Sequence, residues 1–433
     1  MNLLHANDRP GEYPPSWYAE TAVPHAPLPV LRGEARADVC VVGAGYTGLS
    51  AALHLAQRGY RVVVLEAQRV GFGASGRNGG QVGSGQRIGQ DRVSALAGPG
   101  RARALWDVAE EARLLVRDLA EGMPGVDFTP GVLHACRSDA EMRAGHDEAA
   151  MLARDYGYGL IEPLDRAAVR AVIGSARFVG GTLDMGGGHL HPLNFALGLS
   201  ARAQAAGAVI HERSEVIGID HGPKVRLRTA EGMVVADHVI FGANGYLSGL
   251  APEVEARVMP INNFIIATEP LGDRAADVLA RPVAAEDSRF VINYWRLSGD
   301  GRLLFGGGES YGWRFPADIA AKVRKPMLEI YPQLADARIT HAWGGTLAIT
   351  MTRMPCFRRV APNVLSASGY SGHGVTHATF AGKVMAAAVA GQAERFDLLA
   401  GLPQPRFPGG ARLRHPLLVL AMVWYSLRDR LGV

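Results

Sequence analysis

The chain has 433 residues, of which 48% are hydrophobic and 20% charged, a composition that supplies a large buried core and excludes a disordered protein. Basic residues number 45 and acidic residues 41, so the formal charge is only +4. Because no run of like charges adds to this small excess, we expect no nucleic-acid partner. Four of the basic residues are lysines, at positions 224, 322, 325 and 383, which limits any chemistry that needs a lysine.

The three cysteines, Cys40, Cys136 and Cys356, lie far apart and match no disulfide or zinc spacing. The first 35 residues are polar and proline-rich and lack the apolar core of a secretory signal. The longest apolar run, 417–425, is shorter than the roughly 20 residues that cross a bilayer. These features predict a cytoplasmic protein without a metal site or a transmembrane helix.

The first elements predicted along the chain are a strand at 39–42, a helix at 49–58 and a strand at 61–66. Gly43, Gly45 and Gly48 join the first strand to the helix, and Glu66 ends the second strand. Such glycines let the backbone approach a pyrophosphate at the helix N-terminus, and the carboxylate accepts a hydrogen bond from a ribose hydroxyl. The pattern predicts an NAD or FAD site, with a tight structural turn as the alternative.

A glycine-rich loop follows at 71–81, where five of the eleven residues are glycine. Ordering such a loop costs conformational entropy, which a bound ligand would offset. We interpret the loop as a cradle for a second, larger part of the cofactor, with Arg77 and Asn78 as hydrogen-bond donors. The alternative is a flexible surface loop.

Farther along, helices are predicted at 101–120 and 193–206, and strands at 215–219, 225–229, 233–236 and 239–241. Strand-like runs also occur at 264–268 and 303–305. Strands and helices do not alternate regularly between 91 and 180 or between 260 and 335. We therefore predict two interleaved domains.

A third glycine turn, within 366–374, leads from a strand end into a predicted helix at 375–389. A helix N-terminus carries a partial positive charge and free amide groups. If this one faces a flavin, it stabilises the negative charge of the reduced ring. Another anion site or an ordinary turn are the alternatives.

The loop at 71–81, the block at 186–194 and the turn at 369–374 resemble the FAD-dependent amine and amino-acid oxidoreductases of the D-amino acid oxidase and sarcosine oxidase superfamily. Within it, the chain is most similar to the gamma-glutamylputrescine oxidoreductase branch, from about residue 17 to 430. The resemblance implies an α/β (α+β) fold, in which a Rossmann-like FAD-binding domain at 36–90, 182–260 and 336–400 is interleaved with an antiparallel-sheet substrate domain at 91–181 and 261–335. Residues 1–35 form an N-terminal extension, and 401–433 carry a C-terminal helix.

The three glycine segments and the resemblance together predict which residues contact a noncovalently bound FAD. They are Gly43, Gly45, Tyr46, Thr47, Gly48, Glu66, Ala67, Gly73, Ala74, Ser75, Arg77, Asn78, Gly79, Gly80, Gln81, Val216, Ala243, Asn244, Gly344, Gly369, Tyr370, Ser371, Gly372, His373, Gly374 and Val375.

Two departures from the family pattern bear on mechanism. Sarcosine oxidases keep a lysine near flavin N5 that activates dioxygen, in a strand similar to 302–305, but no lysine lies between Lys224 and Lys322. The electron acceptor is therefore open between dioxygen and a quinone. Thr346 stands near where relatives carry a carboxylate-binding arginine or a flavin-linking cysteine, which argues against a thioether link and against a simple amino-acid substrate.

Amine oxidation by a flavin needs groups that orient and desolvate the amine rather than an obligatory acid–base pair. The catalytic residues are not predicted, but five side chains are candidates for the substrate pocket: Trp343, Tyr294, His191, His189 and Arg296. Tyr294 shares a strand face with Arg296, and His189 shares one with His191. Packing or solvent exposure is the alternative for each.

The stretch 416–430 is predicted to be a helix that packs on the core, contacts a subunit or makes a peripheral membrane contact. For the whole chain we predict oxidation of a primary or secondary amine, with a gamma-glutamylputrescine-like polyamine derivative favoured. A hydride passes to flavin N5 and water hydrolyses the imine. The alternatives are an amino- or imino-acid dehydrogenase that reduces a quinone, and a non-catalytic flavin-binding structural protein.

Overall fold

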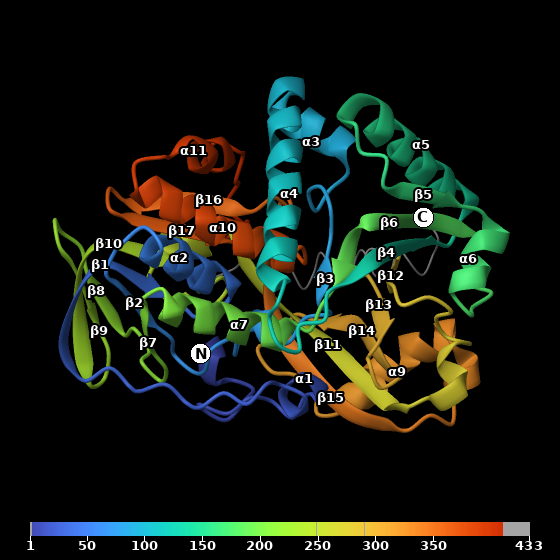
Figure 1. Ribbon diagram of the computed structural model, residues 1–433, viewed down its shortest axis with the longest axis horizontal. Coiled ribbons are helices and arrows are strands. Elements are labelled where there is room, and N and C mark those ends of the chain that lie inside the picture. The colour runs from blue at the N-terminus through green and yellow to red at the C-terminus, as the bar shows by residue number, and fades with distance from the viewer. Residues whose placement is uncertain (1, 248, 290, 410–433) are drawn as a thin grey trace.

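The computed structural model describes residues 2–247, 249–289 and 291–409 (Figure 1). The helix predicted at 416–430 lies outside the described residues. Within them, the strands form two sheets that lie side by side, with helices packed on both. The predicted mixed fold, a Rossmann-like unit interleaved with a second sheet, is confirmed.

The first sheet has the strand order β16-β17-β10-β1-β2-β7, and β8 and β9 extend it beside β10. Strands β17, β10, β1, β2 and β7 run parallel. Residues of β2 are all buried, as expected for a parallel strand covered on both faces. The strand bounds are β1 Gly33–Val42, β2 Val62–Leu65, β7 Val209–His211, β8 Gly218–Asp220, β9 Val225–Arg228, β10 Gly232–Phe241, β16 Cys356–Ala361 and β17 Val364–Ser368.

One strand of this sheet is longer than expected. The separate strands predicted at 233–236 and 239–241 are joined into β10, because Asp237 and His238 between them include no glycine or proline that would break the strand. The first part of β10 pairs antiparallel with β9, and its end pairs parallel with β17.

Three helices pack together on this sheet: α2 (Tyr46–Ala56) lies between α7 (Pro192–Ala205) and α10 (Gly374–Val389). The longest described helix, α4 (Pro99–Ala120), contacts α10 and begins at a proline, which suits the first turn of a helix. The other helices are α1 Trp17–Glu20, α3 Gln90–Ala97, α5 Asp139–Tyr156, α6 Arg166–Val172, α8 Pro252–Glu255, α9 Ile319–Ile330 and α11 Glu394–Ala400.

The second sheet has the order β15-β11-β14-β13-β12-β4-β6-β3, with β5 beside β6. Its neighbours pair antiparallel, apart from the parallel pair of β12 and β4. In Figure 1, α5 lies over β4, β5 and β6, and α9 lies beside β14. The strand bounds are β3 Gln81–Val82, β4 Thr129–Cys136, β5 Ile161–Leu164, β6 Gly180–His189, β11 Met259–Pro270, β12 Ala284–Asp287, β13 Tyr294–Leu297, β14 Arg302–Ser310 and β15 Ile339–Ile349.

Sheet membership differs from the predicted domain ranges at three strands. The sequence places β3, β15 and β6 from residue 182 onward inside the FAD-binding ranges, whereas all three strands belong to the second sheet. Strand β6 runs directly into α7, and β15 is followed by β16 of the first sheet. The chain therefore changes sheets at these points without a linker that composition would reveal.

Candidate functional site

A cavity of about 790 Å³ lies between the two sheets, within the usual size range of ligand sites. Its walls include Val42, Leu65 and Gly242, at or just beyond the carboxyl ends of β1, β2 and β10, and Asn263 and Leu347 on the second sheet. The carboxyl ends of parallel strands are where open α/β sheets bind ligands.

The first glycine turn presents backbone donors to this cavity. Helix α2 begins after Gly45, which has no side chain to cap it. Tyr46 N donates to Ser75 Oγ at 3.1 Å, and the N–H groups of Thr47 and Gly48 have no side-chain acceptor among the described residues. A Cβ atom on Gly45 would lie 2.8 Å from Ser75 Oγ, and one on Gly48 would lie 1.8 Å from Gly43 O. The glycines therefore permit a close crossing of backbone that leaves an anion site at the start of α2.

Glu66 follows the end of β2 and lines the same end of the cavity. Its carboxylate accepts hydrogen bonds from Ala44 N at 2.7 Å and from Gln68 N at 2.8 Å. Burial raises the pKa of Glu66 to about 7, although these backbone bonds act to lower it. Each oxygen has a second acceptor site, so the carboxylate can also accept from a ribose hydroxyl.

The loop at 71–81 is held by its own side chains. Asn78 Nδ2 donates to Ala74 O at 3.0 Å and to Ser75 O at 2.9 Å, and its Oδ1 accepts from Gly80 N at 2.7 Å. Arg77 was expected to donate to the cofactor, but its side chain turns away from the cavity. It donates to Phe72 O at 2.6 Å and to Asp8 Oδ2 at 2.8 Å, because these buried acceptors lie behind the loop.

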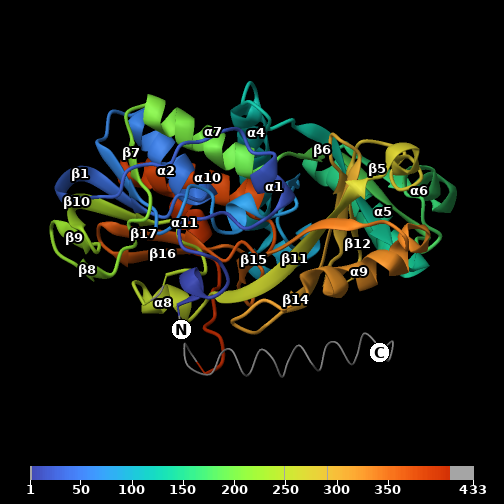
Figure 2. The same cartoon turned by 90° about the horizontal axis from the view of Figure 1, so that it is seen from below.

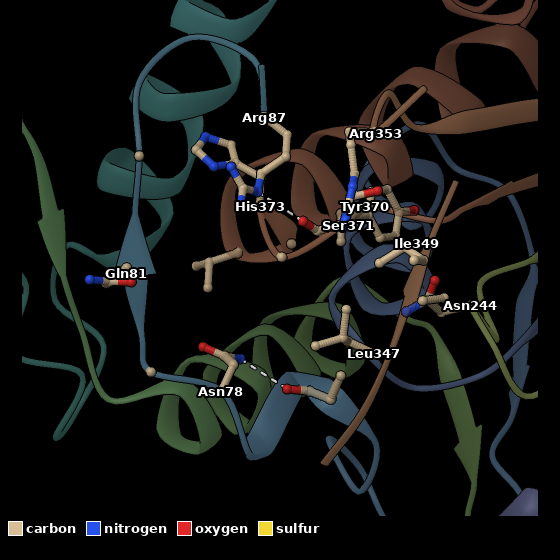
Figure 3. A pocket seen from close by; sticks show the side chains of 18 of the residues that line it. Asn78, Gln81, Arg87, Asn244, Leu347, Ile349, Arg353, Tyr370, Ser371 and His373 are labelled. Carbon is tan, nitrogen blue, oxygen red and sulfur yellow. Dashed lines mark hydrogen bonds between the residues drawn. The ribbon is translucent and has the colours of Figure 1, made fainter. Parts of the chain in front are cut away.

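The third glycine turn forms a further edge of the cavity (Figure 3). Helix α10 begins after His373, again without a side-chain cap in the residues described. Ser371 has a φ of 54° and Asn244 a φ of 48°, both in the left-handed region that few non-glycine residues adopt. Asn244 Oδ1 accepts from Gly369 N at 2.9 Å. Burial, with a contribution from Arg87, lowers the pKa of His373 to about 4.

Most residues expected to contact FAD line this one cavity, although they come from distant segments. They are Gly43, Gly45, Tyr46, Thr47, Glu66, Ala67, Gly73, Ala74, Ser75, Asn78, Gly79, Gln81, Val216, Ala243, Asn244, Tyr370, Ser371, Gly372, His373, Gly374 and Val375. The structure places Gly48, Arg77, Gly80, Gly344 and Gly369 behind the wall. Gly80, for example, packs so closely that a Cβ atom would lie 2.0 Å from Leu190 O.

Residues 38–388 match the family described as FAD dependent oxidoreductase, or DAO. The chain belongs to this family. Over 98% of its length it is 41% identical to the whole of gamma-glutamylputrescine oxidoreductase from Escherichia coli (strain K12). It is also 42% identical, over 96% of this chain and 97% of the relative, to a protein described as probable oxidoreductase OrdL from Rhizobium meliloti (strain 1021).

Solved structures agree on the fold. Glycine oxidase from Geobacillus kaustophilus superposes with a TM-score of 0.71 at 21% identity, covering 86% of this chain and all of that one. L-proline dehydrogenase from P. horikoshii gives 0.70 at 19%, covering 86% and 98%. The chain is thus a DAO-family oxidoreductase that acts on C–N groups with FAD as cofactor, and the uncapped helix starts, the close-packed glycines and Glu66 fit that cofactor.

Of the five substrate-pocket candidates of this DAO-family chain, Tyr294 lines the cavity. Its ring packs against Gly79 and Gly306, and its hydroxyl donates to Asn263 Oδ1 at 2.6 Å. Trp343, His189, His191 and Arg296 do not reach the cavity wall.

Two of these four side chains, Arg296 and Trp343, instead support the loop from behind. Arg296 donates to Gly79 O at 3.1 Å, and Trp343 Nε1 donates to Arg77 O at 3.1 Å. His191 caps α7 and contacts the ring of Tyr18. Burial and the charge of Arg296 lower the pKa of His189 to about 3. Buried backbone carbonyls need donors, and that need explains why Arg296 and Trp343 lie inside.

Sequence reasoning missed part of the cavity. Beyond the third turn it continues between α5 and the second sheet, lined by Arg87, His134, Glu286, Glu309 and Arg353 among others. None of these residues belongs to a glycine motif. Arg87, six residues after the loop at 71–81, continues its polar and glycine-rich character, which is the one signal that the sequence offers.

Residues that do not line the cavity also restrict the chemistry. Among the described residues no lysine and no cysteine lines it, which agrees with noncovalent FAD. Thr346 donates to Asn262 Oδ1 at 2.8 Å and lies buried in β15. In 2–247, 249–289 and 291–409, no helix has the length and apolar character needed to cross a bilayer.

Proposed function

We propose that this protein oxidises the terminal primary amine of a gamma-glutamylated diamine such as gamma-glutamylputrescine. The observation that carries the proposal is the 41% identity to gamma-glutamylputrescine oxidoreductase, which extends over the full length of that relative. The length of the cavity supports it, because the space continues past the turns expected to hold FAD, toward α5 and β4. A long, unbranched substrate suits such an extension.

FAD, when bound, accepts a hydride equivalent from the carbon beside the amine nitrogen. The protein excludes water around that carbon and fixes its position. Tyr294, Leu347 and Ile349 supply wall on the second sheet. Burial disfavours a charged ammonium, which promotes the neutral amine that this oxidation requires. The N-terminus of α10 lines the cavity and would offer positive potential to negative charge that develops on a bound flavin.

A second candidate is a dehydrogenase of amino or imino acids that reduces a quinone. It is favoured by the absence of lysine from the described wall of the cavity, since dioxygen activation in similar enzymes uses one. Dioxygen and a quinone therefore both remain proposed acceptors. The segment proposed to contact a membrane, 416–430, lies outside the described residues. The three cysteines are buried and free, which supports the proposed cytoplasmic location.

Anaerobic reduction of the flavin tests these functions. The holoenzyme is mixed with gamma-glutamylputrescine, putrescine, proline or an amino acid, and flavin absorbance is followed; air is then admitted and hydrogen peroxide is measured. We expect bleaching by gamma-glutamylputrescine first. Bleaching by amino or imino acids instead would favour the second candidate, and no bleaching by any substrate would favour a structural role. If air does not reoxidise the flavin and no peroxide forms, whereas an added quinone does reoxidise it, dioxygen is excluded as the acceptor.

A further inference from the structure

Two arginines line the part of the cavity that lies beyond the third glycine turn, both near Ser371 (Figure 3). Arg87 comes from the segment between β3 and α3, and Arg353 from the turn after β15. Arg87 Nε donates to Ser371 O at 3.0 Å. Figure 3 shows both side chains extending toward Ser371. Two segments far apart in sequence thus bring guanidinium groups to the same place.

The backbone at this place is held in an unfavourable conformation. Arg353 has a φ of 62° and Ser371 a φ of 54°. Non-glycine residues in this region cost energy, and such residues cluster at functional sites. The surroundings hold Ser371 in place, since Thr350 N donates to its Oγ at 3.2 Å. Arg353 thus adopts a strained backbone conformation, and its side chain lines the cavity.

The arginines share their end of the cavity with carboxylates. Glu309, at the end of β14, accepts a hydrogen bond from Tyr311 OH at 2.6 Å and lies within electrostatic range of both arginines. Glu286, on β12, lies 3.3 Å from His134 Nδ1 and within range of Arg87. Burial lowers the pKa of Arg353, Arg87 lowers it further, and Glu309 opposes both. Positive and negative groups therefore lie close together in this part of the cavity.

A site with both guanidinium groups and carboxylates complements a ligand that carries a negative and a positive charge close together. Guanidinium groups bind carboxylates through paired N–H donors, and a carboxylate accepts from an ammonium. An α-amino-acid group has both charges on one carbon. A gamma-glutamyl amide has such a group at the end opposite its free amine, whereas a simple diamine has none.

We propose that Arg87 and Arg353 bind the α-carboxylate of the substrate's gamma-glutamyl group, and that Glu309 accepts a hydrogen bond from its α-ammonium. This inference rests on the proposed function, because it names the part of that substrate which does not react. It assigns recognition of the amino-acid end to residues outside the glycine motifs. Thr346 has no part in it, although the corresponding region binds a carboxylate in relatives.

Three putrescine derivatives separate the two charges. Gamma-glutamylputrescine has both, glutarylputrescine has the carboxylate alone, and N-acetylputrescine has neither. We expect Arg353→Met and Arg87→Met each to lower kcat/KM about 10- to 100-fold for the first two compounds, mainly through KM, as for loss of a charged hydrogen bond. For N-acetylputrescine, kcat/KM should change less than about threefold in either variant. For Arg353→Lys, kcat/KM should lie between that of the wild type and that of Arg353→Met, because lysine keeps the positive charge but lacks the paired N–H donors of the guanidinium group.

Glu309→Gln should lower kcat/KM about 10-fold for gamma-glutamylputrescine. It should leave kcat/KM for the other two compounds unchanged. Arg226→Met, at an exposed position on β9 outside the cavity wall, is the matched control and should change none of them. Equal losses on all three compounds in the arginine variants, or no loss on any, would overturn the proposal. An increase in the FAD dissociation constant that accounts for the losses would do the same, because the arginines would then serve the cofactor.

A binding measurement separates this proposal from the proposed function. Gamma-glutamylmethylamide has the amino-acid group but no terminal amine, and its binding to the holoenzyme can be followed by the flavin absorbance spectrum. We expect Arg353→Met to raise its dissociation constant at least 10-fold. If gamma-glutamylputrescine is not oxidised but this shift is found, the function fails and the subsite stands. Equal binding to both proteins, or none to the wild type, overturns the subsite.

Discussion

At the scale of single residues, Gly45 shows most directly how the site excludes side chains. The position where its Cβ atom would lie is 2.8 Å from Ser75 Oγ, and Ser75 Oγ accepts a hydrogen bond from Tyr46 N at 3.1 Å. A side chain at position 45 would therefore separate the loop at 71–81 from the start of α2. Both segments are expected to contact FAD.

Replacing Gly45 by valine should abolish FAD binding while leaving a folded apoprotein. The larger side chain occupies the approach to the first turn of α2, where the pyrophosphate would accept from backbone N–H groups. The ratio of flavin to protein absorbance after gel filtration measures the loss. Gly100→Val, in the first turn of α4 with no neighbour within 4 Å of the added Cβ, serves as the control. A yellow Gly45→Val protein with normal flavin content would disprove the assignment of this turn.

Arg77 and Arg87 mark the limit of sequence reasoning at this scale. Both lie in a polar, glycine-rich stretch of the chain, and the composition of that stretch gives no reason to choose between them. Arg77 turns inward, where it donates to Phe72 O, Asp8 and Gly344 O. Arg87 reaches the cavity. The direction that each arginine side chain takes depends on which buried acceptors lie nearby in the fold, and the sequence pattern does not contain that information.

At the scale of elements, the strand–turn–helix unit from β1 to β2 was predictable, because its pattern is local and regular. Which side chains of a strand face the cavity was harder to predict. Alternation correctly puts Tyr294 and Arg296 on one side of β13, yet the ring of Tyr294 lines the cavity and Arg296 supports the loop behind it. The alternation of a strand shows which side chains share a face. It does not show where along that face the cavity ends, because that depends on the elements packed against the strand.

The start of α7 depends on the protonation state of a buried histidine. His191 Nδ1 accepts a hydrogen bond from Asn194 N at 3.1 Å, which caps the helix. Because Thr21 Oγ1 donates its own proton to Trp17 O at 2.7 Å, it accepts from His191 Nε2–H at 3.1 Å. This neutral tautomer satisfies both nitrogens. Burial and the charge of Arg296 lower the pKa of His191 to about 3.

His191 should therefore reduce stability as the pH falls. Its pKa is about 3 in the folded protein against 6.5 in the unfolded chain, so between these values the unfolded state binds the extra proton and stability falls with pH. Between pH 7 and 5 this amounts to about 2 kcal/mol. Asparagine also caps helices, so His191→Asn should lose about 2 kcal/mol less than the wild type over this interval in urea unfolding. If the free energies of unfolding of the wild type and His191→Asn fall in parallel with pH, this role of His191 is refuted. His221 is exposed, and His221→Asn serves as the control whose pH dependence should match the wild type.

At the scale of the whole molecule, the N-terminal segment connects the two sheets. The sequence identifies residues 1–35 only as a proline-rich extension. In the structure, Gly11 N donates to Gln68 Oε1 at 2.6 Å beside the first sheet, and Asn7 Oδ1 accepts from Phe315 N at 2.8 Å beside the second. In Figure 2, α1 of this segment lies between the strands of the first sheet, at the left, and those of the second, at the right. Such contacts between distant residues leave no periodic pattern, so the sequence could not predict them.

Asp8 makes a buried ion pair between this segment and the loop at 71–81. Its carboxylate lies 2.8 Å from Arg77 Nη1, and the side chains are 16% and 4% exposed. Arg77 also donates to Gly344 O of β15 at 3.2 Å. A single guanidinium group thus joins the N-terminal segment, the loop expected to hold FAD, and the second sheet.

Asp8→Ala should destabilise the protein by about 3 to 5 kcal/mol, because it leaves the buried Arg77 without a carboxylate. Denaturant unfolding measures the loss. Glu12→Ala changes an acidic residue of the same segment whose side chain is 64% exposed, and should cost less than about 1 kcal/mol. Asp8→Ala combined with Arg77→Met should be more stable than Asp8→Ala alone, because removing both charges leaves none unpaired. If the double variant is as unstable as the sum of its single variants, the two residues do not act as a pair and this segment is not held by their charges.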